Sequence, residues 1–158
     1  MSKLRTVLTT LAVAAGLLVL SPAAPAQAAA AAPARAAASC SGSLVDYQQM
    51  GSYHKVEVYW NSSTKKNCAI LHTSHGTPHE MHVSIQRCTE TSPSSGCTPD
   101  LASGGYVEDS GNYTQYAGPV TLTSGNKCVR VFAYAKIGSN SWGADSGSMR
   151  GGNQAAFC

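Results

Sequence analysis

The histidines are the residues of this chain whose type and spacing best suit chemistry, because neutral imidazole binds zinc and copper. All five lie between residues 54 and 82, and four of them, the candidate metal ligands, follow the spacing His72-x2-His75-x3-His79-x2-His82. We expect a strand, a turn at Gly76-Thr77-Pro78 and a second strand, a hairpin across which His72 and His82 come together. The alternative is a polar hairpin with solvated histidines, and we expect no cofactor.

Aromatic side chains suggest a second kind of site, since exposed rings on a β-scaffold can stack on sugar rings. The candidate glycan-stacking residues are Trp142, Tyr106, Tyr113 and Tyr116. The alternative is that aromatic residues simply favour strands and fill the core. Trp60 belongs to that second group, because it shares one face of a strand with Val56 and Val58.

Catalytic motifs are weak in this sequence. Gly143-Ala144-Asp145-Ser146-Gly147-Ser148 resembles the segment around the nucleophile of chymotrypsin-like proteases. Those enzymes need two packed barrels to assemble their triad, and the folded part of this chain is too short for two. The few carboxylates lie mostly in turn-rich segments, which argues against a glycosidase pair. We therefore expect no enzyme.

The cysteines indicate a disulfide framework in an oxidising compartment. There are six, with no Cys-x-x-Cys pair: Cys40, Cys68, Cys88, Cys97, Cys128 and Cys158. Six cysteines allow 15 pairings. Cys88 and Cys97 bracket a Ser/Thr/Pro/Gly-rich segment, Thr89 to Gly96, and look like the two sides of one loop. If they pair, Cys40–Cys68 and Cys128–Cys158 are the simplest remaining choices.

The first residues have the three parts of a secretory signal. Lys3 and Arg5 precede an apolar run from Val7 to Leu20, and Ala26-Gln27-Ala28 supplies small residues for cleavage. We expect a signal peptide over residues 1–28, an Ala/Pro-rich spacer over 29–38 and one folded domain over 39–158. The run is short for a membrane span and no second run follows, so we expect no transmembrane segment. From residue 39 onward, eight basic residues balance eight acidic ones, so we expect no nucleic-acid partner.

Beyond residue 39 the hydrophobic period is two almost everywhere, which is typical of half-buried strands. The clearest strands are expected over 54–60, 81–86 and 129–136, with shorter ones at 44–47, 68–72, 113–116 and 120–123. Turn formers separate them, including Ser110-Gly111-Asn112. The tail from Gly138 to Phe157 has room for one last strand. About seven short strands and three disulfides predict an all-β domain, either a β-sandwich or a small barrel.

Several segments resemble a known family. They are Ser39-Cys40-Ser41-Gly42-Ser43-Leu44, Asn61-Ser62-Ser63-Thr64 leading to Asn67-Cys68-Ala69, and Tyr113-x-x-Tyr116-Ala117-Gly118-Pro119-Val120 leading to Lys127-Cys128-Val129. In these the chain is similar to the small secreted streptomycete proteins of the spore-associated protein A family. The resemblance implies export and association with spores or aerial hyphae, and it carries no catalytic or ligand residues.

Two functions are consistent with these features. The first is a secreted, non-catalytic protein retained at the spore or hyphal surface, where it binds a cell-wall or spore-surface component or forms part of that surface. The second is a freely secreted protease-inhibitor-like or antimicrobial effector. It would use the loop from Thr89 to Gly96, because a disulfide-held loop loses little freedom on binding.

Overall fold

Eight β-strands and one short helix make up the part of the chain that the structure, a computed structural model, describes: residues 38–92, 96–149 and 157–158. The expected signal peptide and, except for Ala38, the expected spacer lie outside these residues. The elements are β1 (Ser43–Met50), β2 (His54–Asn61), β3 (Lys66–Thr73), β4 (His79–Arg87), β5 (Tyr106–Tyr113), β6 (Tyr116–Thr123), β7 (Val129–Ile137), β8 (Asn140–Asp145) and α1 (Ser146–Met149).

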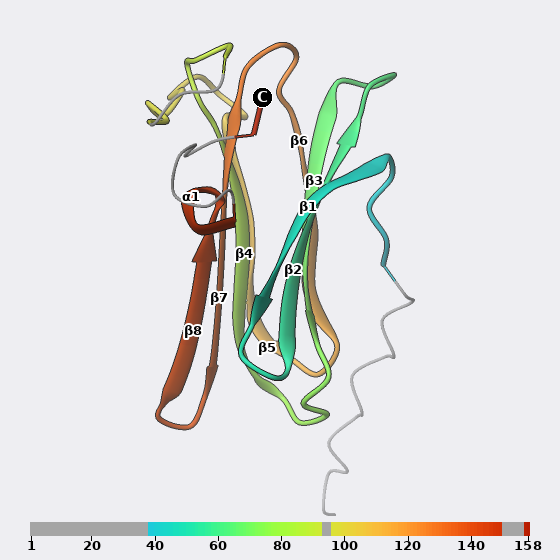
Figure 1. Cartoon of the computed structure of the whole chain (residues 1–158), viewed down its shortest axis with the longest axis vertical. Coiled ribbons are helices and arrows are strands. Elements are labelled where there is room, and N and C mark those ends of the chain that lie inside the picture. The colour runs from blue at the N-terminus through green and yellow to red at the C-terminus, as the bar shows by residue number, and fades with distance from the viewer. Residues whose placement is uncertain (1–37, 93–95, 150–156) are drawn as a thin grey trace, which may run out of the picture. The chain divides into compact units, whose positions relative to one another are not determined.

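The strands form two four-stranded antiparallel sheets that lie face to face (Figure 1). The first sheet has the order β1-β2-β3-β6 and the second β5-β4-β7-β8. The chain crosses between the sheets after β3, β5 and β6. The all-β prediction is confirmed, and of its two forms the structure is the sandwich.

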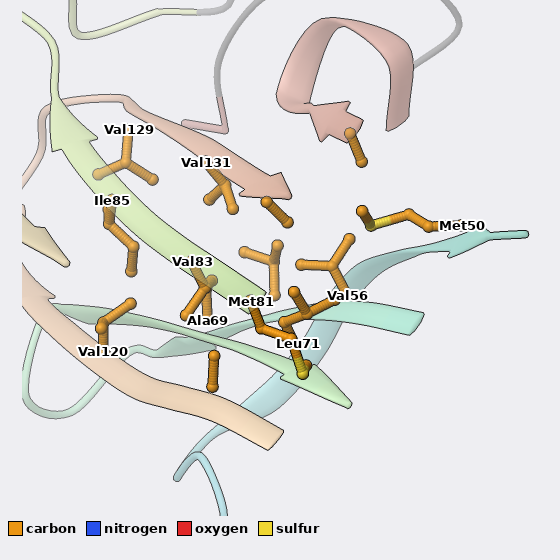
Figure 2. Close-up of a cluster of buried hydrophobic side chains, with 14 of the residues drawn as sticks. Met50, Val56, Ala69, Leu71, Met81, Val83, Ile85, Val120, Val129 and Val131 are labelled. Atoms are coloured by element: carbon orange, nitrogen blue, oxygen red, sulfur yellow. The ribbon is translucent and has the colours of Figure 1, made fainter. Parts of the chain in front are cut away.

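The core lies between the sheets and follows from the period of two. Val56 and Val58 of β2 and Val83 and Ile85 of β4 point inward with no exposed surface. Figure 2 shows side chains of this core, with Val56, Val83 and Ile85 among them, converging from both sheets. Burying one such side chain stabilises the fold by about 1.5–3 kcal/mol. Small residues such as Ala133 occupy inward positions of β7 and let the two sheets approach each other.

One strand was missed. The turn expected at Ser110-Gly111-Asn112 lies inside β5, and the strand expected over 113–116 is the end of β5, a turn and the start of β6. Strand β5 is an edge strand, so its outward residues are polar and its inward residues include a carboxylate, Asp109. That carboxylate accepts hydrogen bonds from the Tyr113 hydroxyl and the Gly118 amide. An edge strand with satisfied polar groups shows no apolar alternation to find.

The Tyr-Ala-Gly-Pro-Val segment that carries the family resemblance has a packing role. Ala117 is fully buried in β6. Gly118 has a φ of 89°, and a Cβ there would lie 3.0 Å from the Ala69 carbonyl oxygen. Only glycine adopts this conformation without strain, so the segment fixes how β6 lies on β3.

The cysteines pair as Cys40–Cys68, Cys88–Cys97 and Cys128–Cys158, the simplest of the pairings considered. All three bridges lie at the end of the sandwich where β2 meets β3 and β6 leads into β7, which we call the disulfide end. The opposite end, where β1 turns into β2 and β7 into β8, holds three of the five histidines and is called the histidine end.

Removing the longest bridge should cost the most stability, because a disulfide restricts the unfolded chain more when its loop is longer. Cys128 and Cys158 are 30 residues apart, and Cys88 and Cys97 only 9. We expect the double alanine variant of the first pair to lose about 3.5 kcal/mol of unfolding free energy in a urea titration, and that of the second pair about 1 kcal/mol less. Equal losses, or the reverse order, would contradict this account.

Candidate functional site

A hollow of about 640 Å³ opens at the disulfide end of the sandwich. Its size is within the range of small-molecule sites. It is bounded by β1, the β2–β3 turn, the β6–β7 turn and the last two residues of the chain. The lining residues are Val45, Trp60, Lys65, Asn67, Ser124, Gly125, Asn126, Lys127, Phe157 and Cys158.

Trp60 and Phe157 give the hollow its apolar wall. Trp60 is on the inward face of β2, as predicted, but it lies beyond the last core layer and is half-buried instead of enclosed. Phe157 is held by two 2.7 Å backbone hydrogen bonds with Val129 and by the neighbouring Cys128–Cys158 bridge. The Lys65 ammonium lies 6.0 Å from the centre of the Trp60 ring, at the outer range of a cation–π contact.

Hydrogen bonds between β3 and the β6–β7 turn build the polar wall. The buried Asn67 amide donates to the Ser124 hydroxyl at 2.7 Å. The amides of Ser124 and Gly125 both donate to the Lys65 carbonyl, at 3.1 and 3.3 Å. These bonds fix the position of the turn, so the polar groups of Asn126 and Lys127 reach the hollow from a rigid support.

Lys127 is oriented by an ion cluster. The Asp100 carboxylate is 2.8 Å from both the Lys127 ammonium and the Arg87 guanidinium. Hydrogen bonds from Lys127 and then from Arg87 hold the pKa of Asp100 well below its ordinary value. Asp100 itself does not line the hollow, and no lining residue has a carboxylate side chain. The lining therefore combines an indole, amide and hydroxyl groups, and two ammonium groups.

This arrangement suits a ligand with a ring face, hydroxyl groups and negative charge. A sugar ring presents apolar C–H groups that pack on an aromatic face, and its hydroxyls pair with amide and hydroxyl side chains. Ammonium groups near the mouth favour an anionic substituent such as a carboxylate or phosphate. The alternation in β2 places Trp60 in the core, and nothing in the sequence shows that the β6–β7 turn completes a hollow around it.

The four aromatic residues proposed from sequence for stacking do not form one surface. Tyr116 is buried and cannot receive a ligand from solvent, so its assignment was wrong. Tyr113 is half-buried with its hydroxyl on Asp109, and Trp142 packs inward against His54. Tyr106 is 47% exposed on the outer face of the second sheet, where its hydroxyl donates to Glu108. Phe132, 42% exposed on that same face, was not singled out.

The hairpin expected to join His72 and His82 does not exist. Strands β3 and β4 belong to different sheets, so His72 lies on the outer face of one sheet, beside Glu57, and His82 on that of the other, beside Glu108. The structure does bring His75 and His79 together, with ring centres 5.3 Å apart. His54, which the spacing excluded, joins them: its Nε2 lies 2.8 Å from that of His79.

The described residues contain one trio of His, Cys, Asp or Glu ligand atoms within 4.8 Å of one another, and it belongs to Cys88, Glu90 and Cys97. Those two cysteines form a disulfide, so their sulfurs are not free to bind a metal.

Burial, and next the charge of His79, lowers the pKa of His54. His54 is therefore neutral near pH 7.

Two other segments considered from sequence have structural roles where they are described. Ser146 is fully buried, and Asp145 accepts the Ser148 amide hydrogen bond at 2.8 Å, so the protease-like segment forms the start of α1. The loop from Thr89 to Gly96 is held at its base, where the Thr89 amide donates to the Thr98 carbonyl at 2.9 Å. Residues 93–95 of that loop lie outside the described residues.

Comparison with known proteins finds a relative from Streptomyces coelicolor named spore-associated protein A, which is 30% identical over 149 residues. The match covers 93% of this chain and 81% of the relative. No protein-family model matches the chain, and no solved structure matches it. None of the helical structure in the described ranges is long and apolar enough to cross a membrane.

Asp100 should make the protein sensitive to acid. Because its pKa is lower in the folded than in the unfolded state, its stabilising effect is present above the ordinary value of 3.8 and is lost as the pH falls below it. We expect Asp100→Asn to be less stable than the wild type at neutral pH, and to lose less stability between about pH 5 and pH 2, in thermal unfolding. Glu80→Gln, an exposed change at the histidine end, serves as control. A variant that loses stability as steeply as the wild type would contradict this.

Proposed function

The chain belongs to the spore-associated protein A family, and we propose that it is exported and retained, without catalysis, on the surface of spores or aerial hyphae. Membership of this family supports a location on spores or aerial hyphae. The signal-like residues before position 29 support export. Retention requires a contact with the surface, and the hollow at the disulfide end is the feature that provides one.

We propose that the hollow binds an anionic glycan of the cell wall or spore coat. The observation that carries this proposal is the composition of the lining. Trp60 offers a ring face, and Asn67 and Ser124 mark a fixed polar wall. The exposed Lys65 supplies positive charge, and Lys127 lines the hollow as part of the Arg87–Asp100–Lys127 ion cluster, which has one more positive than negative charge. The exposed side chains of Lys65 and Asn126 can hydrogen-bond to an anionic, hydroxylated ligand, whereas a neutral apolar ligand offers them no partner.

The charge balance of the chain supports a local contact. From residue 39 onward the basic and acidic side chains are equal in number, so attraction over the whole surface is weak. We expect binding to a charged polymer to depend on Lys65 and on the ion cluster that contains Lys127. A glycan bound at this one site is therefore favoured over a nucleic acid or a membrane, which would be held by charge spread over the whole surface.

The alternative, a freely secreted inhibitor or antimicrobial effector, depends on the loop between Cys88 and Cys97. Its base is fixed, but the residues that would contact a target include 93–95, which lie outside the described residues. No contact in the described part of the chain favours this function over surface binding.

Two changes in the hollow should release the protein from the surface. We expect Trp60→Ala to weaken the affinity for salt-washed spore walls about 10-fold, which corresponds to about 1.4 kcal/mol. Lys65→Glu, an exposed change, should weaken binding and reduce its dependence on salt. The measurement is a pull-down of the purified mature chain with walls, and circular dichroism verifies that each variant is folded.

Phe132→Ala is the matched control, because it removes an exposed aromatic ring from the outer face of the second sheet. It should bind walls as the wild type does. Loss of binding in Phe132→Ala with retention in Trp60→Ala would move the site to the outer face. Wild-type protein that stays entirely in the supernatant of the pull-down would overturn surface retention.

A further inference from the structure

A pair of histidines closes the histidine end of the sandwich. His54 of β2 is fully buried and His79 of β4 is 6% exposed, and their Nε2 atoms lie 2.8 Å apart. The two strands belong to different sheets, so the pair joins the sheets beyond the apolar core. Trp142 of β8 covers the His54 ring at a centre-to-centre distance of 5.2 Å.

The hydrogen bonds around the pair determine where its protons lie. Nδ1 of His79 is 2.8 Å from the Thr77 carbonyl oxygen, which only accepts, so this nitrogen carries a proton. In a neutral ring, Nε2 of His79 then has a lone pair. His54 must donate its own Nε2–H to that lone pair, and its Nδ1 is left without a proton.

That arrangement leaves one polar atom unsatisfied. Nδ1 of His54 is buried and has no hydrogen-bond partner. The Met50 backbone favours the protonated form of His54. Because Nε2 of that ring faces His79, Nδ1 is the nitrogen that would donate to the Met50 carbonyl once it is protonated. Moving the His54 proton from Nε2 to Nδ1 would satisfy this atom, but it would also set two Nε2 lone pairs facing each other. A cation between them removes the conflict.

We propose that His54 and His79 bind a divalent transition-metal cation, with zinc as the best fit, between their Nε2 atoms. Each imidazole would then donate its Nδ1–H to a backbone carbonyl, of Met50 and of Thr77, which is the usual support for a metal-binding histidine. Zinc–nitrogen bonds of about 2.0–2.1 Å in a tetrahedral site place the two nitrogens about 3.3 Å apart. The pair must therefore open by only about 0.5 Å.

His75 is the third ligand in this proposal. Its ring centre is 5.3 Å from that of His79, and its Nδ1 contacts the Thr77 hydroxyl at 2.8 Å, which leaves Nε2 to bind a metal. It lies in the connection between β3 and β4, where Gly76 has a φ of 81° and open space around it. The ligand atoms of the three histidines do not all lie within 4.8 Å of one another, so this connection must move to bring the third imidazole to the pair.

The site differs from the one predicted from spacing. It keeps His75 and His79, replaces His72 and His82 with His54, and is independent of the proposed glycan site, which lies at the other end of the sandwich. The two excluded histidines therefore serve as matched controls within the same chain, because each lies on an outer sheet face beside a glutamate.

The first test is calorimetric titration of the mature, disulfide-bonded chain with Zn²⁺ near neutral pH. We expect one site in the wild type, in His72→Gln and in His82→Gln. Affinity should fall at least 10-fold in His79→Gln and in His75→Gln. Equal loss in the control variants, or no binding by the wild type, would overturn the proposal.

The second test needs no variant, because a change at a buried histidine can impair folding. Nitrogen NMR of the imidazole rings in the wild type reports which ring nitrogen carries the proton. Without metal, His54 should be protonated at Nε2, and saturating Zn²⁺ should move its proton to Nδ1 while His79 keeps its Nδ1 proton. A His54 ring that keeps its Nε2 proton in the presence of Zn²⁺ would contradict a site between the two rings.

Discussion

The packing of two inward sheet faces is the constraint on which the rest of the structure depends. Each sheet buries one side of an alternating pattern, and small residues such as Ala133 and Ala135 keep the faces close. Such a sandwich has a core about 10 Å thick. The two sheets cover this core on both sides. At the two ends of the sandwich no strand covers it, so side chains in and near the turns must do so.

The two ends are completed by different chemistry. At one end three disulfides fix the turns and the last residues, and the space that remains between the sheets is the hollow beside Trp60. At the other end the described residues form no disulfide, and the His54–His79 pair joins the sheets instead. Covalent bonds can hold an open hollow without filling it, whereas an imidazole pair closes the space that it occupies. This difference explains why the proposed glycan site and the proposed metal site lie at opposite ends.

The sequence was informative wherever one residue reports its own environment. Alternation predicted the strands that bury one face, because burial acts on each position separately. The even number of cysteines predicted that bridges form, because each bridge uses two of them. Strand β5 was missed because an edge strand with Asp109 inside has no apolar period. The roles of Trp60 and His54 depend on which strands end beside each other in space. The spacing His72-x2-His75-x3-His79-x2-His82 suggested a hairpin, but the chain changes sheets between His72 and His79.

The chain has two tryptophans, which lie at opposite ends of the sandwich. Their indole N–H signals give the most direct test of the account. Trp60 lines the hollow, and Trp142 packs on His54. In nitrogen–proton correlation spectra of the wild type, soluble anionic fragments of the spore wall should shift the Trp60 signal and leave Trp142 in place. Fragments that shift Trp142 alone, or neither signal at concentrations where the protein binds walls, would contradict the claim that the disulfide end is the binding end.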